Sequence, residues 1–164
     1  MKKFNLLLVD DIENNIYTLR LIIEEKFKNI NIISAPSAQD AVFEIMKHDI
    51  DLILCDIQMP GINGFELIQY LNDIENNYRS PIILITAIYT DKEAIQKGYD
   101  VGAIDYLTKP IDDELLCSKL NVYLNIYENK KEDKKKINTQ EEVLKTKQIK
   151  IYTMIDELHR FSPH

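Results

Sequence analysis

The chain has few glycines and no long apolar run, and each scarcity excludes a class of protein. Its 4 glycines form no cluster of the kind that cradles phosphates, which argues against a P-loop or dinucleotide site. No stretch approaches the length that spans a bilayer, and an acidic pair follows too soon after the N-terminal lysines for a signal peptide. We therefore expect a cytoplasmic protein with no membrane partner.

Cysteine is also scarce, and acidic residues outnumber basic ones. Cys55 lies in an apolar run and Cys117 in an expected helix, and their wide separation suits reduced core thiols better than a disulfide or a metal pair. The net charge of −7 and the pI near 5.0 argue against a surface that tracks a phosphate backbone. We expect no direct nucleic-acid partner.

Short apolar runs alternate with stretches of helical period along most of the 164 residues. The runs are rich in Ile, Leu and Val and hardly alternate in polarity, which predicts strands covered on both faces. They lie at residues 4–9, 30–33, 52–55, 82–85 and 104–107. The pattern predicts an α/β fold, a doubly wound parallel sheet with helices on both faces, in which ligands bind beyond the carboxyl ends of the strands.

Polar residues mark several helix starts, and the last helix is expected to be very long. Ser37 with Asp40 resembles a capping arrangement, and Thr90 with Glu93 forms a capping box. After residues 112–114 no proline or glycine occurs until Pro163.

Within this expected amphipathic helix, residues recur at an interval of seven, a pattern typical of packing against a partner helix. They are Leu116, Tyr123, Lys130, Ile137, Leu144, Ile151 and Leu158. We expect a homodimer through this helix, although the charged segment 130–136 weakens the pattern and a solvated or frayed tail is the alternative.

Acidic residues end two of the apolar runs. In a doubly wound sheet whose first and third strands are neighbours, Asp10, Asp11 and Asp56 converge on one pocket and repel one another. A hard divalent cation relieves that repulsion, and Mg²⁺ prefers a few carboxylates, a carbonyl and retained waters. The predicted ligands are Asp11, Asp56 and the backbone carbonyl of Gln58, with Asp10 in support.

Such a site suits a phosphoryl group, with Asp56 as the nucleophile. Lys109 can pair with Asp56 at rest and with a phosphoryl oxygen afterwards. The hydroxyl of Thr86 and the backbone amide of Ala87 could contact other oxygens. Each residue alone has an ordinary structural explanation, as a cap, a salt bridge or a strand end, and only their occurrence together at strand ends indicates a site.

The combined motif resembles the bacterial response-regulator receiver domain over residues 1–125. The residues that carry the resemblance are Asp10-Asp11, Asp56, Met59-Pro60-Gly61, Gly64, Thr86-Ala87, Gly102-Ala103, Tyr106 and Lys109-Pro110. The resemblance implies a flavodoxin-like five-stranded sheet of order 2-1-3-4-5, on which the convergence of the three acids depends. It also implies Mg²⁺-dependent transfer of a phosphoryl group to Asp56 from a sensor histidine kinase or phosphotransfer protein, and autodephosphorylation.

The resemblance further implies roles for residues around the phosphoacceptor. Thr86 would move toward the phosphoryl group and Tyr106 would rotate inward behind it, whereas the ordinary interpretation of Tyr106 is an amphipathic packing residue with a solvated hydroxyl. The Lys109-Pro110 peptide would be cis. Gln58 and Ile88 would border the route of the attacking water.

Two other interpretations remain open at this point. A haloacid-dehalogenase-like phosphohydrolase also uses an aspartyl nucleophile, but it needs a second acid where this chain has Gln58. In the other interpretation the chain is a dimerisation module that is not phosphorylated, in which the acidic pocket is a vestige and only the long helix has a function.

We expect residues 126–164 to form a coiled-coil linker to an output domain absent from this sequence, and residues 160–164 are similar to the entrance of class III nucleotide cyclase domains. The chain itself would be no enzyme beyond its own phosphorylation and dephosphorylation.

Overall fold

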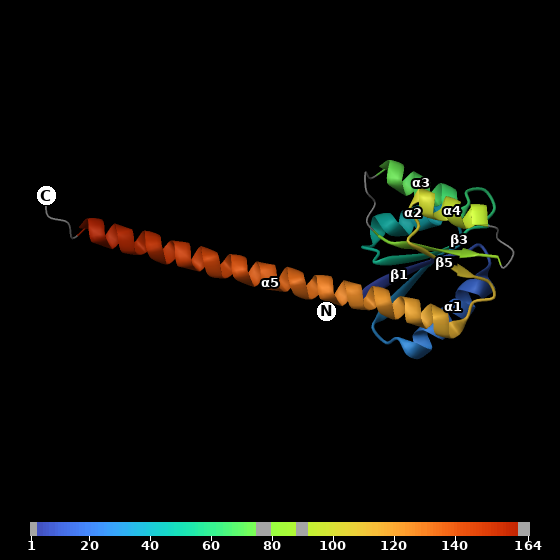
Figure 1. The fold of residues 1–164 in the computed structure, drawn as a ribbon, viewed down its shortest axis with the longest axis horizontal. Helices are drawn as coiled ribbons and strands as arrows, with labels where there is room; N and C mark the ends of the chain where they lie inside the picture. The colour runs from blue at the N-terminus through green and yellow to red at the C-terminus, as the bar shows by residue number, and fades with distance from the viewer. Residues whose placement is uncertain (1–2, 75–79, 88–91, 161–164) are drawn as a thin grey trace. The chain divides into compact units, whose positions relative to one another are not determined.

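The computed structural model describes residues 3–74, 80–87 and 92–160, in which strands and helices alternate (Figure 1). The strands are β1 (Phe4–Val9), β2 (Ile30–Ala35), β3 (Leu52–Asp56), β4 (Ile82–Thr86) and β5 (Asp105–Thr108). The helices are α1 (Glu13–Lys26), α2 (Ala38–Lys47), α3 (Gly64–Ile74), α4 (Lys92–Val101) and α5 (Asp113–Arg160).

The strands form one parallel sheet of order β2-β1-β3-β4-β5, which confirms the predicted flavodoxin-like fold. β1 and β3 are neighbours, and Val9 at the end of β1 pairs with Cys55 near the end of β3. Asp10 and Asp56 are the residues that follow this pair, so they lie side by side at the carboxyl ends of β1 and β3. This register brings the predicted acidic residues together.

Helices cover both faces of the sheet. α2, α3 and α4 lie on one face, and α1 with the first turns of α5 lies on the other (Figure 1). On the first face, Leu7, Val9 and Ile53 pack with buried residues of α2 and α3. Their neighbours in the same strands, such as Leu6 and Leu54, are also fully buried, which explains why these apolar runs do not alternate.

The prediction that every strand is covered on both faces is wrong for β2. Only Ala35 in this strand is buried, and Asn31 and Ser34 are exposed. β2 lies at an edge of the sheet and pairs only with β1, so one side of it has no neighbouring strand. The last strand also starts and ends one residue later than the predicted range 104–107. β5 begins at Asp105, and the side chain of Ile104 is 42% exposed.

Side-chain caps fix the starts of several helices. The hydroxyl oxygen of Ser37 accepts a hydrogen bond from the Asp40 amide at 3.1 Å, as the sequence predicts. Asn63 caps α3 in the same way, and Asp112 caps α5 by accepting from the Leu115 amide at 3.1 Å. The predicted cap at Thr90 lies outside the described residues.

The long C-terminal helix is confirmed, and α5 runs for 48 residues. Its first turns bury Leu116, Cys117 and Leu120, whereas the later residues of the seven-residue pattern are exposed. Contacts divide the chain into two units, residues 1–124 and 125–164. Among the described residues, no helix combines the length and the hydropathy that crossing a bilayer requires.

Gly64 allows α3 to begin against the end of β3, and its replacement tests this close approach. A Cβ at Gly64 would lie 2.8 Å from the carbonyl oxygen of Asp56 and 3.0 Å from the Cα of Ile57. We expect Gly64→Ala to lower the free energy of unfolding by about 2 kcal/mol, because rigid backbone must shift.

The matched control is Gly61→Asn, because a Cβ at Gly61 would meet nothing within 4 Å and asparagine tolerates its positive φ of 77°. Urea unfolding followed by circular dichroism measures both variants. Equal losses in the two would contradict the role of the close approach.

Candidate functional site

Three carboxylates meet beyond the ends of β1 and β3. One oxygen from each of Asp10, Asp11 and Asp56 lies within 4.8 Å of the other two. Asp10 is 2% exposed and Asp56 is 4% exposed, whereas Asp11 is open to solvent. The structure therefore brings together the three acids that the sequence singled out, two of them in surroundings that disfavour uncompensated charge.

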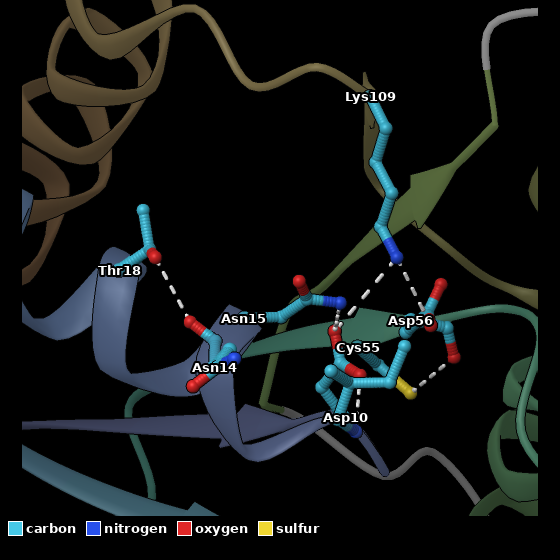
Figure 2. Close-up of polar contacts among 8 residues, drawn as sticks. Asp10, Asn14, Asn15, Thr18, Cys55, Asp56 and Lys109 are labelled. Atoms are coloured by element: carbon cyan, nitrogen blue, oxygen red, sulfur yellow. Dashed lines mark hydrogen bonds and ion pairs between the residues drawn. The ribbon is translucent and has the colours of Figure 1, made fainter.

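Lys109 brings a positive charge to this cluster from the end of β5. Its Nζ lies 3.2 Å from Oδ2 of Asp56 and 3.8 Å from Oδ2 of Asp10 (Figure 2). The backbone amide of Lys109 donates to the carbonyl oxygen of Thr86 at 2.7 Å, and the Lys109-Pro110 peptide is cis. The lysine thus faces both buried carboxylates and is nearer to Asp56.

Asp10 is held by two donors from the start of α1. The Ile12 amide donates to Oδ1 at 2.9 Å, and the side-chain amide of Asn15 donates to Oδ2 at 3.1 Å (Figure 2). Asn15 was missed by the sequence reasoning. Its signal was its position in the first turn of a helix that follows an acid-ended strand, where a polar side chain can face that strand end.

Burial raises the pKa of Asp56 above the ordinary aspartate value. The ammonium group of Lys109 opposes this shift, and the carboxylate of Asp10 adds to it. The backbone of Gln58 also lowers the pKa of Asp56, because it favours the charged form of the carboxylate. A cation at this position would relieve the same repulsion.

Cys55 is the neighbour of Asp56 in β3, and its side chain is fully buried. Burial raises the pKa of its thiol strongly, with the charges of Asp56 and Asp10 adding to the effect. The protonated thiol donates to the carbonyl oxygen of Asp56 at 3.3 Å. Both cysteines are buried and free, so the expectation of reduced core thiols holds in the structure.

Thr86 and Tyr106 lie on the face of the sheet that α4 covers. Thr86 ends β4 and is 5% exposed, and Tyr106 pairs with Leu84 in the adjoining strand. The ring of Tyr99 in α4 meets the Tyr106 ring edge-on, with centroids 6.1 Å apart and planes at 76°. A cavity of about 10 Å³ bordered by Leu84, Thr86 and Tyr106 is far too small for a phenol ring.

Two more of the predicted residues lie in the part of the chain that the structure describes. Gln58 is exposed two residues after Asp56, and Ala87 lines a cavity with Asp10 and Lys109. Ile88, the predicted neighbour of the water route, lies outside the described residues.

The donor set fits a hard divalent cation. Carboxylate oxygens are the ligands that Mg²⁺ prefers, and the exposed Asp11 leaves a side open to solvent where a cation would keep several of its waters. Among the described residues no His joins the acids in the cluster, and the raised pKa of the nearby Cys55 thiol disfavours the thiolate, so a softer metal is disfavoured. The arrangement can hold a cation beside a carboxylate that is itself paired with a lysine.

Comparison with known proteins gives one consistent result. Residues 6–121 match the family model of the response regulator receiver domain. Over 115 residues the chain is 35% identical to the response regulator PleD of Caulobacter vibrioides, which covers 70% of this chain but only 25% of PleD. It is 32% identical to the protein PilH of Pseudomonas aeruginosa, covering 73% of this chain and 96% of PilH.

A solved structure of a two-component response regulator from Clostridium difficile is similar, with a TM-score of 0.67 and 27% identity. The alignment covers 75% of this chain and 97% of that one.

Removing the charge of Asp56 should stabilise the protein in the absence of divalent cations. The raised pKa means that the folded state disfavours the ionised carboxylate, so Asp56→Asn should raise Tm by about 3 °C at neutral pH. Because the folded state binds the proton more tightly than the unfolded chain, acidification through the raised pKa protonates wild-type Asp56 and should shrink the difference.

Thermal unfolding in EDTA from neutral to mildly acidic pH measures this effect. Asp51→Asn is the matched control, since Asp51 lies at the other end of β3, where its Oδ2 accepts from the Asn5 amide at 2.8 Å. A wild type more stable than Asp56→Asn at neutral pH would contradict the electrostatic account.

Proposed function

The chain belongs to the response regulator receiver domain family of two-component systems, and on that premise we propose that Asp56 is its phosphoacceptor. The observation that carries the proposal is the placement of Asp56 among two further carboxylates within 4.8 Å, with Lys109 Nζ at 3.2 Å. The donor is the phosphohistidine of a sensor histidine kinase or of a phosphotransfer protein.

In the proposed step, an Asp56 carboxylate oxygen attacks phosphorus in line with the departing imidazole nitrogen of the donor. A phosphorus–oxygen bond forms, the phosphorus–nitrogen bond breaks, and the imidazole keeps the electron pair. Lys109 then moves its ion pair from the carboxylate to a phosphoryl oxygen. The hydroxyl of Thr86 and the amide of Ala87 donate to the other oxygens.

The residues proposed to hold Mg²⁺ are Asp11, Asp56 and the carbonyl of Gln58, with Asp10 in support. When bound, Mg²⁺ supplies positive charge to the phosphoryl oxygens. The bond to phosphorus is later hydrolysed by water, whose route Gln58 borders, and Ile88, the other residue predicted there, lies outside the described residues.

We propose that Thr86 and Tyr106 transmit a conformational change from phosphorylated Asp56 to the surface of the domain. Thr86 moves toward the phosphoryl group, and the Tyr106 ring moves into the volume that Thr86 leaves. The resting cavity beside Thr86 is only about 10 Å³ and the ring of Tyr99 meets Tyr106 edge-on, so we propose that α4 shifts together with the Tyr106 ring. The tight packing makes the change a switch between two arrangements.

Treatment with acetyl phosphate and Mg²⁺ tests the proposed function. We expect intact-protein mass spectrometry to find one added phosphoryl group, mapped to Asp56, and none in EDTA or in Asp56→Asn. The matched control is Asp51→Asn, which leaves the cluster intact and should be modified like the wild type. An unmodified wild type under every donor would instead favour the vestigial pocket.

We also propose that the helix after residue 125 joins two copies of the chain, with residues 1–125 as the receiver and 126–164 as the linker. Ile137, Leu144, Ile151 and Leu158 are between 54% and 71% exposed at intervals of seven. In a pair of parallel helices in register, each of these residues faces the same residue of the other chain, and each such pair forms an apolar layer. Lys130 would oppose Lys130 in that arrangement, which weakens the start of the seam.

A lysine at Leu144 should separate the dimer. Burial of two opposed ammonium groups should cost about 3 kcal/mol, a loss of roughly a hundredfold in affinity. The matched control is Ile149→Lys, which makes the same change at a residue 66% exposed and off the seam. Analytical ultracentrifugation measures both. Equal behaviour of the two variants would exclude this seam.

The phosphohydrolase interpretation does not survive the comparisons, because the matched family is the receiver and Gln58 stands where the second acid would be. The chain spans about a quarter of PleD and nearly all of PilH. An output module attached to this receiver therefore stays a prediction.

A further inference from the structure

We propose that Asn15 is a positioning residue that fixes Asp10 for Mg²⁺ binding. The inference rests on the proposed function, and it assigns a role to a side chain outside the phosphoacceptor and its expected ligands. Asn15 acts through Asp10, without contact to the cation or the phosphoryl group. Its effect is to set the affinity of the acidic cluster for the cation.

The first support is the double anchoring of Asp10. The Ile12 amide holds Oδ1 at 2.9 Å, and Asn15 Nδ2 holds Oδ2 at 3.1 Å. A carboxylate with both oxygens held by donors from the same helix start has little freedom to turn about its χ angles. The carboxylate therefore keeps the orientation that faces Asp11 and Asp56.

The second support is the competition for Oδ2 of Asp10. Lys109 Nζ lies 3.8 Å from this atom, beyond hydrogen-bond distance, whereas Asn15 is within it (Figure 2). Without Asn15, Oδ2 would be free to close on Lys109. That contact would draw the lysine from Asp56 and bring its positive charge closer to the carboxylate that supports the cation.

The backbone fixes Asn15 where this contact requires it. The amide of Asn15 donates to the carbonyl oxygen of Ile12 at 3.0 Å, so the first turn of α1 places the side chain over the end of β1. Ile12, the N-cap residue of α1, has no side-chain capping bond. The Asp10–Asn15 pair therefore also ties the strand to the helix start.

Neighbouring Asn14 provides a matched comparison. It is exposed, and its backbone carbonyl accepts from the Thr18 hydroxyl at 2.9 Å (Figure 2). Asn14→Ala changes the same residue type in the same turn without removing the bond to Asp10. Alanine favours the helix more than asparagine in both positions, so the effects on helix propensity match.

The test is calorimetric titration of Mg²⁺ into the full chain for the wild type, Asn15→Ala, Asn15→Gln and Asn14→Ala. Loss of a residue that orients a ligand typically weakens metal binding 10- to 100-fold, so we expect Asn15→Ala to raise the Kd for Mg²⁺ by about tenfold. Asn15→Gln keeps the donor and should recover part of the affinity. Asn14→Ala should bind as the wild type does.

Phosphorylation by acetyl phosphate supplies a second readout. In Asn15→Ala the half-saturating Mg²⁺ concentration should rise by the same factor, about tenfold. A lower saturating rate with unchanged half-saturation would overturn the positioning role. Unchanged Mg²⁺ affinity in Asn15→Ala, beside a wild type that is phosphorylated on Asp56, would overturn this inference alone. A wild type that neither binds Mg²⁺ nor accepts a phosphoryl group would overturn the proposed function with it.

Discussion

The repulsion between Asp10 and Asp56 constrains the rest of the domain, because both carboxylates are almost fully buried at the ends of adjacent strands. The fold holds them there with apolar strands buried on both faces and with a few donors aimed at their oxygens. Lys109 compensates part of the charge. The negative charge that Lys109 does not compensate favours a cation at the carboxyl ends of these strands. The same uncompensated charge therefore lowers the stability of the fold and raises the affinity of the site for a cation.

The architecture could be predicted because the dominant signals are local and strong. Continuous runs such as Leu6 to Val9 and Leu52 to Cys55 fit only strands buried on both faces, and polar helix starts separate them. The apolar pattern placed the acids at strand ends on one side of the sheet, but their meeting also required β1 and β3 to be neighbours. The strand order came from the resemblance to a family, because periodicity within one strand does not specify its neighbour.

The features that could not be predicted depend on neighbours distant in sequence or on a single rotamer. β2 has an apolar sequence like the central strands, and only its place at the edge exposes it. The contact between Asn15 and Asp10 depends on the turn that starts α1 and on one side-chain orientation. The pairing of Tyr99 with Tyr106 likewise needs the packing of α4 on β5, which no pattern in either segment encodes.

The burial of both thiols has a consequence for how this protein can be studied and how it tolerates its surroundings. Cys55 is 0% exposed and Cys117 is 6% exposed. Oxidants and alkylating reagents therefore meet little exposed sulfur while the domain stays folded. A cysteine introduced on the surface would be the sole reactive one, ready for a fluorophore or spin label without first deleting the native pair.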